Sequence, residues 1–124
     1  MNELVIGLDH IDIVVGDTEI AAEFFAKLGF SVVRRLGDGR GSIELRFPGS
    51  DIILELTPSL RADGSRLPLG LRHMALRCSD LDAAVSAFTA AGLAIPEGPR
   101  LVAATGRRVA NTTMPDNQVL QFTE

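Results

Sequence analysis

Apolar and polar residues alternate along residues 8–15, where Ile11, Ile13 and Val15 occupy every second position. In an extended strand, a period of two places these three apolar side chains on the same face. The pattern therefore predicts a β-strand that turns one face toward a core.

A helical period follows this strand. Asp17 precedes the first turn as a suitable N-cap, and Gly29 follows the last turn at the C′ position. Between them, apolar residues recur at the spacing of an amphipathic helix. The apolar residues of this helix are Ile20, Ala21, Phe24, Phe25 and Leu28.

Short strands are predicted after the helix, separated by turns rich in Gly, Pro and Asp. The strands cover about residues 30–36, 42–47 and 51–57, with turns at Asp38-Gly39-Arg40-Gly41 and Pro48-Gly49-Ser50. Residues 58–70 are polar, contain several Gly and Pro residues, and are typical of a linker.

The second half of the chain repeats the first. With an offset of 63, His10 aligns with His73, and the segment Leu8-Asp9-His10-Ile11-Asp12-Ile13 lies over Leu71-Arg72-His73-Met74-Ala75-Leu76. The same offset pairs Asp17 with Asp80, Ala21 with Ala84, Phe25 with Phe88 and Gly29 with Gly92. The ends match at an offset of 66, where Leu54-Glu55-Leu56-Thr57 lies over Leu120-Gln121-Phe122-Thr123.

The repeat predicts the same elements in the second half. Asp80 is the N-cap of a helix that carries Ala84, Val85, Phe88 and Ala91 and ends at Gly92. Strands are expected at about residues 93–96, 107–113 and 118–123, with a turn at Met114-Pro115-Asp116-Asn117. We therefore expect one α+β domain over residues 1–124, made of two βαβββ modules at about 4–57 and 71–124 and related by pseudo-two-fold symmetry.

Four polar residues occupy equivalent positions in the two copies. His10, Glu55, His73 and Gln121 each alternate with apolar neighbours, so all four side chains point away from the helix side of their strands. Two imidazoles, a carboxylate and an amide oxygen suit a divalent first-row metal such as Ni, Zn, Mn, Co or Fe. A lone His on a strand is more often structural, and Gln121 alone also fits a surface position, so the metal hypothesis depends on the repeat.

The amino-acid composition indicates which kind of partner this protein binds. The net charge is −4 and Trp and Tyr are absent, which argues against a nucleic-acid-binding surface and favours a small-molecule substrate. Cys78 is the single cysteine, so no disulfide can form within the chain. No secretory signal or membrane-spanning run is visible, and we expect a cytoplasmic protein.

These segments resemble the vicinal-oxygen-chelate superfamily of glyoxalase I, methylmalonyl-CoA epimerase, extradiol dioxygenases, fosfomycin-resistance enzymes and bleomycin-resistance proteins. The matching motifs are LDHIDIVVGD, FFAKLGF, IILELTPS, LRHMALRCSDLDAAVSAF and MPDNQVLQF, which span nearly the whole chain. The resemblance implies mixed sheets that curve around a central metal held by His10, Glu55, His73 and Gln121. It also implies a homodimer.

Two positions depart from the family pattern. The last ligand of the family is usually Glu and can move protons, whereas Gln121 cannot accept a proton. Glyoxalase I usually carries an Arg and an Asn that hold glutathione, and Val14 and Ser59 stand at the corresponding positions. We therefore expect proton transfer through Glu55 or metal-bound water, and no dependence on glutathione.

The resemblance favours a metal-dependent lyase or isomerase that acts on a small carbonyl substrate through a stabilised enolate. Glu55 is then the general base, while Arg77 and Asp12 are candidates for substrate binding. Simple polar positions at the rim of the site are the competing interpretation for Arg77 and Asp12.

Two alternatives remain open. Two His and one carboxylate around iron would suit an extradiol dioxygenase, although such enzymes usually take the carboxylate from the position of Gln121. A non-catalytic, bleomycin-resistance-like binding protein is the other alternative. The retained His10, Glu55 and His73 argue against it, as does the lack of Trp and Tyr for ligand stacking.

Overall fold

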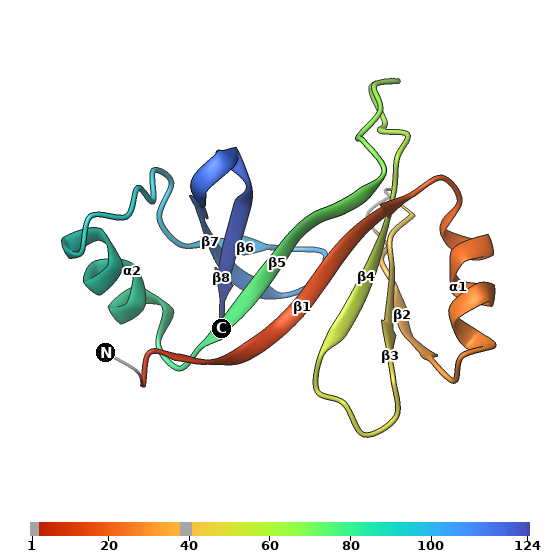
Figure 1. Ribbon diagram of the computed structural model, residues 1–124, viewed down its shortest axis with the longest axis horizontal. Coiled ribbons are helices and arrows are strands. Elements are labelled where there is room, and N and C mark those ends of the chain that lie inside the picture. Colours follow the sequence, from red (N-terminus) through yellow and green to blue (C-terminus); the bar gives the residue numbers. More distant parts are fainter. Residues whose placement is uncertain (1–2, 38–40) are drawn as a thin grey trace. The chain divides into compact units, whose positions relative to one another are not determined.

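The computed structural model describes residues 3–37 and 41–124. These residues form two α-helices, one 3-10 helix and eight β-strands, which confirms the predicted α+β class (Figure 1). The first half contains β1 (Val5–Val15), α1 (Thr18–Ala26), β2 (Ser31–Arg35), β3 (Ile43–Arg46) and β4 (Ile53–Pro58). The second half contains β5 (Gly70–Cys78), α2 (Leu81–Ala90), β6 (Arg100–Val102), β7 (Arg107–Thr113), the 3-10 helix η1 (Pro115–Asn117) and β8 (Val119–Thr123). Neither α-helix of the described part is long and apolar enough to span a membrane.

The chain divides into two compact units. One comprises His10–Arg72, and the other comprises Met1–Asp9 with His73–Glu124. In the first unit the strand order is β2-β3-β4-β1, and in the second it is β5-β8-β7-β6. The β1–β4 and β5–β8 pairs are parallel and the other pairs within each unit are antiparallel, so both units repeat one mixed topology.

The core of the His10–Arg72 unit lies between α1 and one face of β3 and β4. Ala22 is the only fully buried residue of the helix, and it packs against Ile43, Leu45 and Leu56. Partly buried residues complete this cluster: Val15, Ala21, Phe25, Phe30 and Leu54. Removal of these apolar surfaces from water holds the helix to the sheet.

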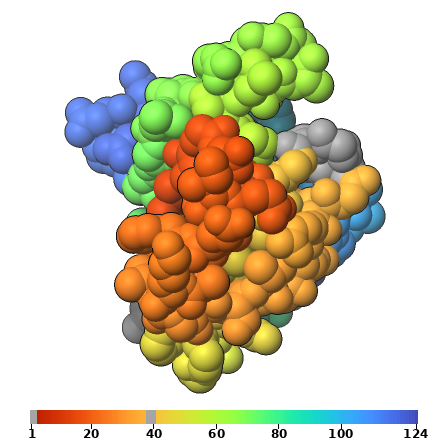
Figure 2. All heavy atoms as spheres, turned by 90° about the vertical axis from the view of Figure 1, so that its right-hand side faces the viewer, coloured from red at the N-terminus to blue at the C-terminus, as the bar shows by residue number. Residues whose placement is uncertain are grey.

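The sheet covers only part of the apolar surface of α1. Ala21, Ala22 and Phe25 pack against the strands, whereas Ile20, Phe24 and Leu28 have exposed fractions of 66%, 59% and 56%. Figure 2 looks onto this helix, which appears in orange. The predicted helix is present, and several of its apolar side chains remain exposed.

Both predicted caps of α1 are present. The Asp17 side chain accepts a hydrogen bond of 3.0 Å from the backbone N–H of Ile20. At the other end, Phe30 N–H donates to the Phe25 carbonyl and Gly29 N–H donates to that of Ala26. This is the bond pattern of a Schellman motif, in which Gly29 has the positive φ of 101° that the C′ position requires.

The other unit repeats this arrangement around α2. Asp80 caps the helix by accepting from Ala83 N–H, and Gly92 ends it with a φ of 101°. Leu81 and Ala84 are buried against Phe122. The rest of this core is formed by Cys78 and Ala110, with Leu4, Val5, Leu76, Val85, Phe88, Ile95 and Leu120 packed around them.

The strand predicted at residues 93–96 is not formed. The strand that pairs with β7 is instead the short β6, which begins at Arg100. Pro96 and Pro99 have no N–H to donate to a ladder, so the chain between α2 and β6 cannot continue as a paired strand. Thr112 contacts this segment through its side chain, which donates a hydrogen bond of 2.7 Å to the Ala94 carbonyl.

The turn regions are partly as predicted. Residues 38–40 of the first predicted turn lie outside the described residues. At the second turn, Ser50 N–H donates to the Phe47 carbonyl and Gly49 has a φ of 86°. Residues 114–117 form a turn that contains η1.

Candidate functional site

Two of the predicted metal ligands lie on neighbouring strands of the His10–Arg72 unit. The parallel register pairs His10 with Ile53 and Asp12 with Glu55. Because paired positions share a face and faces alternate along a strand, Glu55 lies on the same face as His10, two register pairs further along the strands. His10 is 2% exposed, so its imidazole is enclosed.

His73 and Gln121 have the same relationship in the other unit. The parallel register of β5 and β8 pairs Ala75 with Gln121, and His73 precedes Ala75 by two residues. The sequence repeat is therefore matched by an equivalent register in space. Each unit carries one imidazole and one oxygen donor at the same diagonal spacing.

A row of charged residues crosses the sheet of the His10–Arg72 unit. Asp12 is the register partner of Glu55, Glu55 is the partner of Glu44, and Glu44 is the partner of Arg34. All four lie on the face opposite α1, because their neighbours Ile43, Leu45, Leu54 and Leu56 pack toward the helix. We call Glu44, Glu55 and Asp12 the acidic row.

Specific donors offset the charges of the acidic row. Arg34 Nε donates to Glu44 Oε1 at 2.7 Å, and Glu44 is 1% exposed. The Thr57 hydroxyl lies 2.6 Å from Asp12 Oδ1 and 3.4 Å from Glu55 Oε2. Arg72 Nη1 lies 3.4 Å from the second oxygen of Asp12. Such hydrogen-bond partners compensate a carboxylate for the water that it loses on burial.

The equivalent row in the other unit is neutral. Asn111 is the antiparallel partner of Gln121, and Ala75 is its parallel partner. Gln121 Nε2 donates to Asn111 Oδ1 at 3.2 Å, which leaves the Gln121 carbonyl oxygen as the atom suited to a metal. Thr123, the counterpart of Thr57, donates to the backbone carbonyl of Arg108 at 2.9 Å.

The atoms of the four predicted ligands are of the kinds that bind divalent metals. The structure places these ligands as two pairs, one in each unit. Imidazole nitrogens and oxygen donors occur in both pairs, His10 with Glu55 and His73 with Gln121. Among residues 3–37 and 41–124, no three His, Cys, Asp or Glu side chains are grouped in a way that could hold a metal ion.

The two predicted substrate-binding residues have different surroundings. Asp12 has an exposed fraction of 0% and is held by Thr57 and Arg72, so it is not a rim residue. Arg77 Nε lies 3.2 Å from Asp9 Oδ1. Arg107 approaches the second oxygen of the same carboxylate at 3.2 Å, so Asp9 joins two guanidinium groups.

Burial makes Cys78 a poor nucleophile. Its side chain is buried in the core around α2, and burial raises the pKa of its thiol above the ordinary value. The nearby Glu124 carboxylate raises this pKa further, while a hydrogen bond from the Thr123 backbone opposes the change.

Glu44 was missed by the sequence reasoning. It stands between Ile43 and Leu45 in a short strand, and this alternation already placed it on the face opposite those two apolar side chains. The missing information was the pairing of β3 with β4, which puts Glu44 directly beside Glu55. A lone acidic residue in an apolar strand is the signal that could have drawn attention to it.

Comparison with known families agrees with this fold. The model of the glyoxalase/bleomycin resistance protein/dioxygenase superfamily matches residues 7–122. The chain belongs to this superfamily. A search of curated proteins found no match.

Solved structures with the same fold include several methylmalonyl-CoA epimerases. The enzyme from Mycobacterium tuberculosis is 28% identical with a TM-score of 0.81, and the alignment covers 100% of this chain and 91% of that one. A Streptomyces coelicolor epimerase in complex with 2-nitronate-propionyl-CoA is 22% identical with a TM-score of 0.73, covering 96% of each chain. A methylmalonyl-CoA epimerase in complex with methylmalonyl-CoA and NH4+ is 23% identical with a TM-score of 0.73, covering 97% of this chain and 94% of that one.

Proposed function

We propose that this protein is a metal-dependent lyase or isomerase that moves a proton beside the carbonyl group of a small substrate. The observation that carries this proposal is the acidic row, which places Glu44 directly beside Glu55 on the face that also carries His10. Glu44 is buried and Glu55 is half-buried, and a carboxylate shielded from water is suited to act as a general base toward a proton on carbon.

The residues of this site have separate roles in the proposal. His10, Glu55, His73 and Gln121 would hold the metal, which when bound stabilises the negative charge of an enolate. Glu44 and Glu55 are the proposed proton acceptors, and Arg34 forms an ion pair with Glu44 at 2.7 Å. Asp12 and Thr57 orient Glu55 and do not need to touch the substrate.

The similar structures suggest which carbonyl compound to test first. One of them contains methylmalonyl-CoA, a thioester that carries an acidic proton beside its carbonyl. In the present chain the candidate proton acceptors lie in the His10–Arg72 unit, since the equivalent row of the other unit consists of Asn111, Gln121 and Ala75. This asymmetry favours removal and return of the proton by the acidic row.

The proposal is tested by proton exchange in heavy water. Protein reconstituted with Mn²⁺, Co²⁺, Ni²⁺ or Zn²⁺ is incubated with methylmalonyl-CoA, and with the hemithioacetal of methylglyoxal and glutathione as a second carbonyl substrate. Proton NMR then reports the loss of the hydrogen on the carbon beside the carbonyl. We expect metal-dependent exchange with the thioester.

Variants locate the proton acceptor. Glu44→Gln and Glu55→Gln keep the size of the side chain but remove the base, and each should lower the exchange rate at least about 100-fold. Glu23→Gln on the exposed part of α1 is the matched control and should exchange at the original rate. No exchange with either substrate, or full exchange in both Glu44→Gln and Glu55→Gln, would overturn the proposal.

A further inference from the structure

A cavity lies beside the acidic row, within the His10–Arg72 unit. Its volume is about 490 Å³, which lies in the usual range for small-molecule sites. The end of β4 and the linker that follows it form most of the wall, and β5 contributes Arg72. Pro58, Leu60, Ala62 and Leu67 supply the apolar part of the lining.

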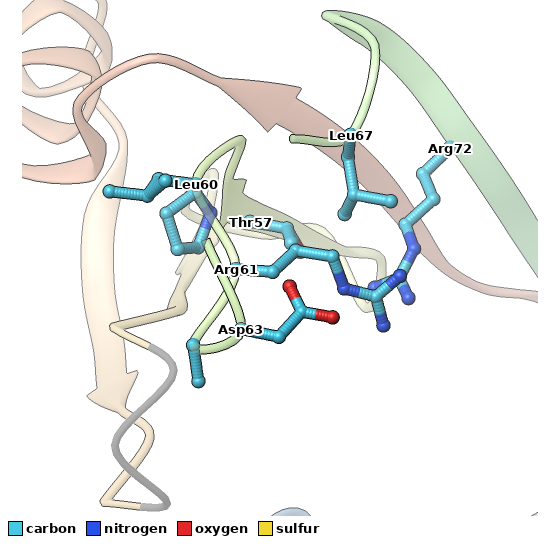
Figure 3. Close-up of a pocket in the computed structure, with 8 residues that line it drawn as sticks. Thr57, Leu60, Arg61, Asp63, Leu67 and Arg72 are labelled. Carbon is cyan, nitrogen blue, oxygen red and sulfur yellow. The ribbon is translucent and has the colours of Figure 1, made fainter. Parts of the chain in front are cut away.

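Two guanidinium groups meet in this cavity. In Figure 3 the side chains of Arg61 and Arg72 point toward one another from opposite sides of the pocket. Arg72 forms an ion pair with Asp12 at the long distance of 3.4 Å. In the described part of the chain, no carboxylate lies within ion-pair distance of Arg61.

The one carboxylate in the lining is satisfied by its own loop. Asp63 Oδ1 accepts from the Ser65 hydroxyl at 2.6 Å and from the Ser65 backbone N–H at 2.9 Å. These hydrogen bonds lower the pKa of Asp63, with a smaller contribution from Arg61. Asp63 is therefore oriented by Ser65 within its own loop, and its interaction with Arg61 is the weaker attraction of two charges.

The cavity is connected to the acidic row by two of its lining residues. Thr57 contacts both Asp12 and Glu55, and Arg72 contacts Asp12. A group bound between the two arginines would therefore be separated from the proposed proton acceptor Glu55 by a single side chain, that of Thr57. The planar guanidinium group presents its N–H donors in a geometry that matches carboxylate or phosphate oxygens, so two such groups favour an oxyanion.

We propose that Arg61 and Arg72 form a subsite for an oxyanion, a carboxylate or phosphate group on an organic molecule whose apolar part lies against Leu60 and Leu67. That this molecule is the substrate rests on the proposed function. The binding itself requires neither metal nor turnover. The subsite selects substrates that carry a negative charge near the reacting carbonyl.

The subsite is tested by binding to the metal-free protein. Butyl phosphate, butyrate and uncharged butanol are titrated into protein labelled with ¹⁵N, and the Nε–Hε signals of Arg61 and Arg72 are followed by NMR. We expect saturable shifts of both signals with at least one of the two anions, and weaker or no binding of butanol. The stronger anion assigns the oxyanion as phosphate or carboxylate.

The main variant is Arg61→Gln, because the exposed side chain of Arg61 is not part of the core. It should weaken binding of the anion about tenfold or more, since a hydrogen bond to a charged group is lost. Arg66→Gln, an exposed arginine of the same linker outside the cavity lining, is the matched control. Arg72→Gln is compared as well, with its folding checked by circular dichroism because Asp12 loses its cation.

The results of these titrations either support or overturn the oxyanion subsite. Equal weakening in Arg61→Gln and Arg66→Gln would show only diffuse attraction of anions and would overturn it. Equal binding of butanol and the anions would also overturn it, as would the absence of saturable shifts. Anion binding without any proton exchange would retain the subsite while rejecting the proposed function.

Discussion

Glu44 and Asn111 occupy equivalent positions in the two units of this protein. Each is the antiparallel partner of a predicted metal ligand, Glu55 in one unit and Gln121 in the other. The two strand pairs have the same register, yet one carries two carboxylates and the other two amides. The repeated fold therefore holds two chemically different strand pairs: the carboxylates of Glu44 and Glu55 can accept a proton, whereas the amides of Asn111 and Gln121 cannot.

Replacing the last predicted ligand by an acid tests the metal hypothesis. Gln121→Glu puts a full negative charge in place of a carbonyl dipole, so a bound divalent cation should be held about tenfold more tightly. Equilibrium dialysis with Co²⁺ or Mn²⁺ measures the dissociation constant. The same substitution at exposed Gln118 should leave it unchanged. Equal affinities for wild-type and Gln121→Glu would show that Gln121 is not a ligand.

The two equivalent threonines provide a comparison of buried hydrogen bonds. Thr57→Val removes the 2.6 Å donor of a fully buried carboxylate, and should lower the free energy of unfolding by about 2–3 kcal/mol. Thr123→Val removes a donor to a neutral backbone carbonyl and should cost only about 1 kcal/mol. Urea denaturation of both variants provides the measurement. A cost for Thr57→Val no larger than that for Thr123→Val would contradict the role given to Asp12.

The C′ glycines of the two helices differ in their surroundings. Gly29 and Gly92 both have a φ of 101°, so alanine at either position adopts a strained backbone at a cost of about 1–2 kcal/mol. A Cβ at Gly29 would also lie 3.3 Å from Cε1 of Phe47, whereas nothing lies within 4 Å of one at Gly92. Gly29→Ala should therefore destabilise the protein more than Gly92→Ala in the same denaturation experiment.

Two exposed ion pairs predict how stability depends on pH. Hydrogen bonding to Arg35 lowers the pKa of Glu19, and hydrogen bonding to Arg108 lowers the pKa of Asp82. A carboxyl whose pKa is lowered on folding adds stability above its ordinary pKa, and this contribution is lost as the pH falls through the folded value.

Thermal unfolding of Glu19→Gln and Asp82→Asn is the corresponding measurement. Each variant should melt below wild-type at pH 7, and the difference should shrink below about pH 4. Glu23→Gln serves as a control with an exposed acid on the same helix as Glu19. A difference that stays constant down to pH 3 would show that these ion pairs do not contribute to stability.

The ends of the two helices could be predicted from the sequence because they depend on residues that are close together in the chain. Asp17 and Asp80 cap their helices as expected, and Gly29 and Gly92 end them. A cap depends on a side chain and on amides three residues away, so the spacing of residues predicts it. The apolar spacing of α1 did not show that Ile20, Phe24 and Leu28 would stay exposed, since hydrophobicity alone does not say which apolar side chains the sheet covers.

The fold class, the internal repeat and the location of His10, Glu55, His73 and Gln121 on matching strands could all be predicted from the sequence, because repeat offsets and alternation can be read along the chain. The pairing of the strands could not. It became visible in the folded protein, where Glu44 lies beside Glu55 and where Arg61 and Arg72 share a cavity. Strand order and loop closure depend on contacts between residues far apart in the chain, which no local pattern encodes.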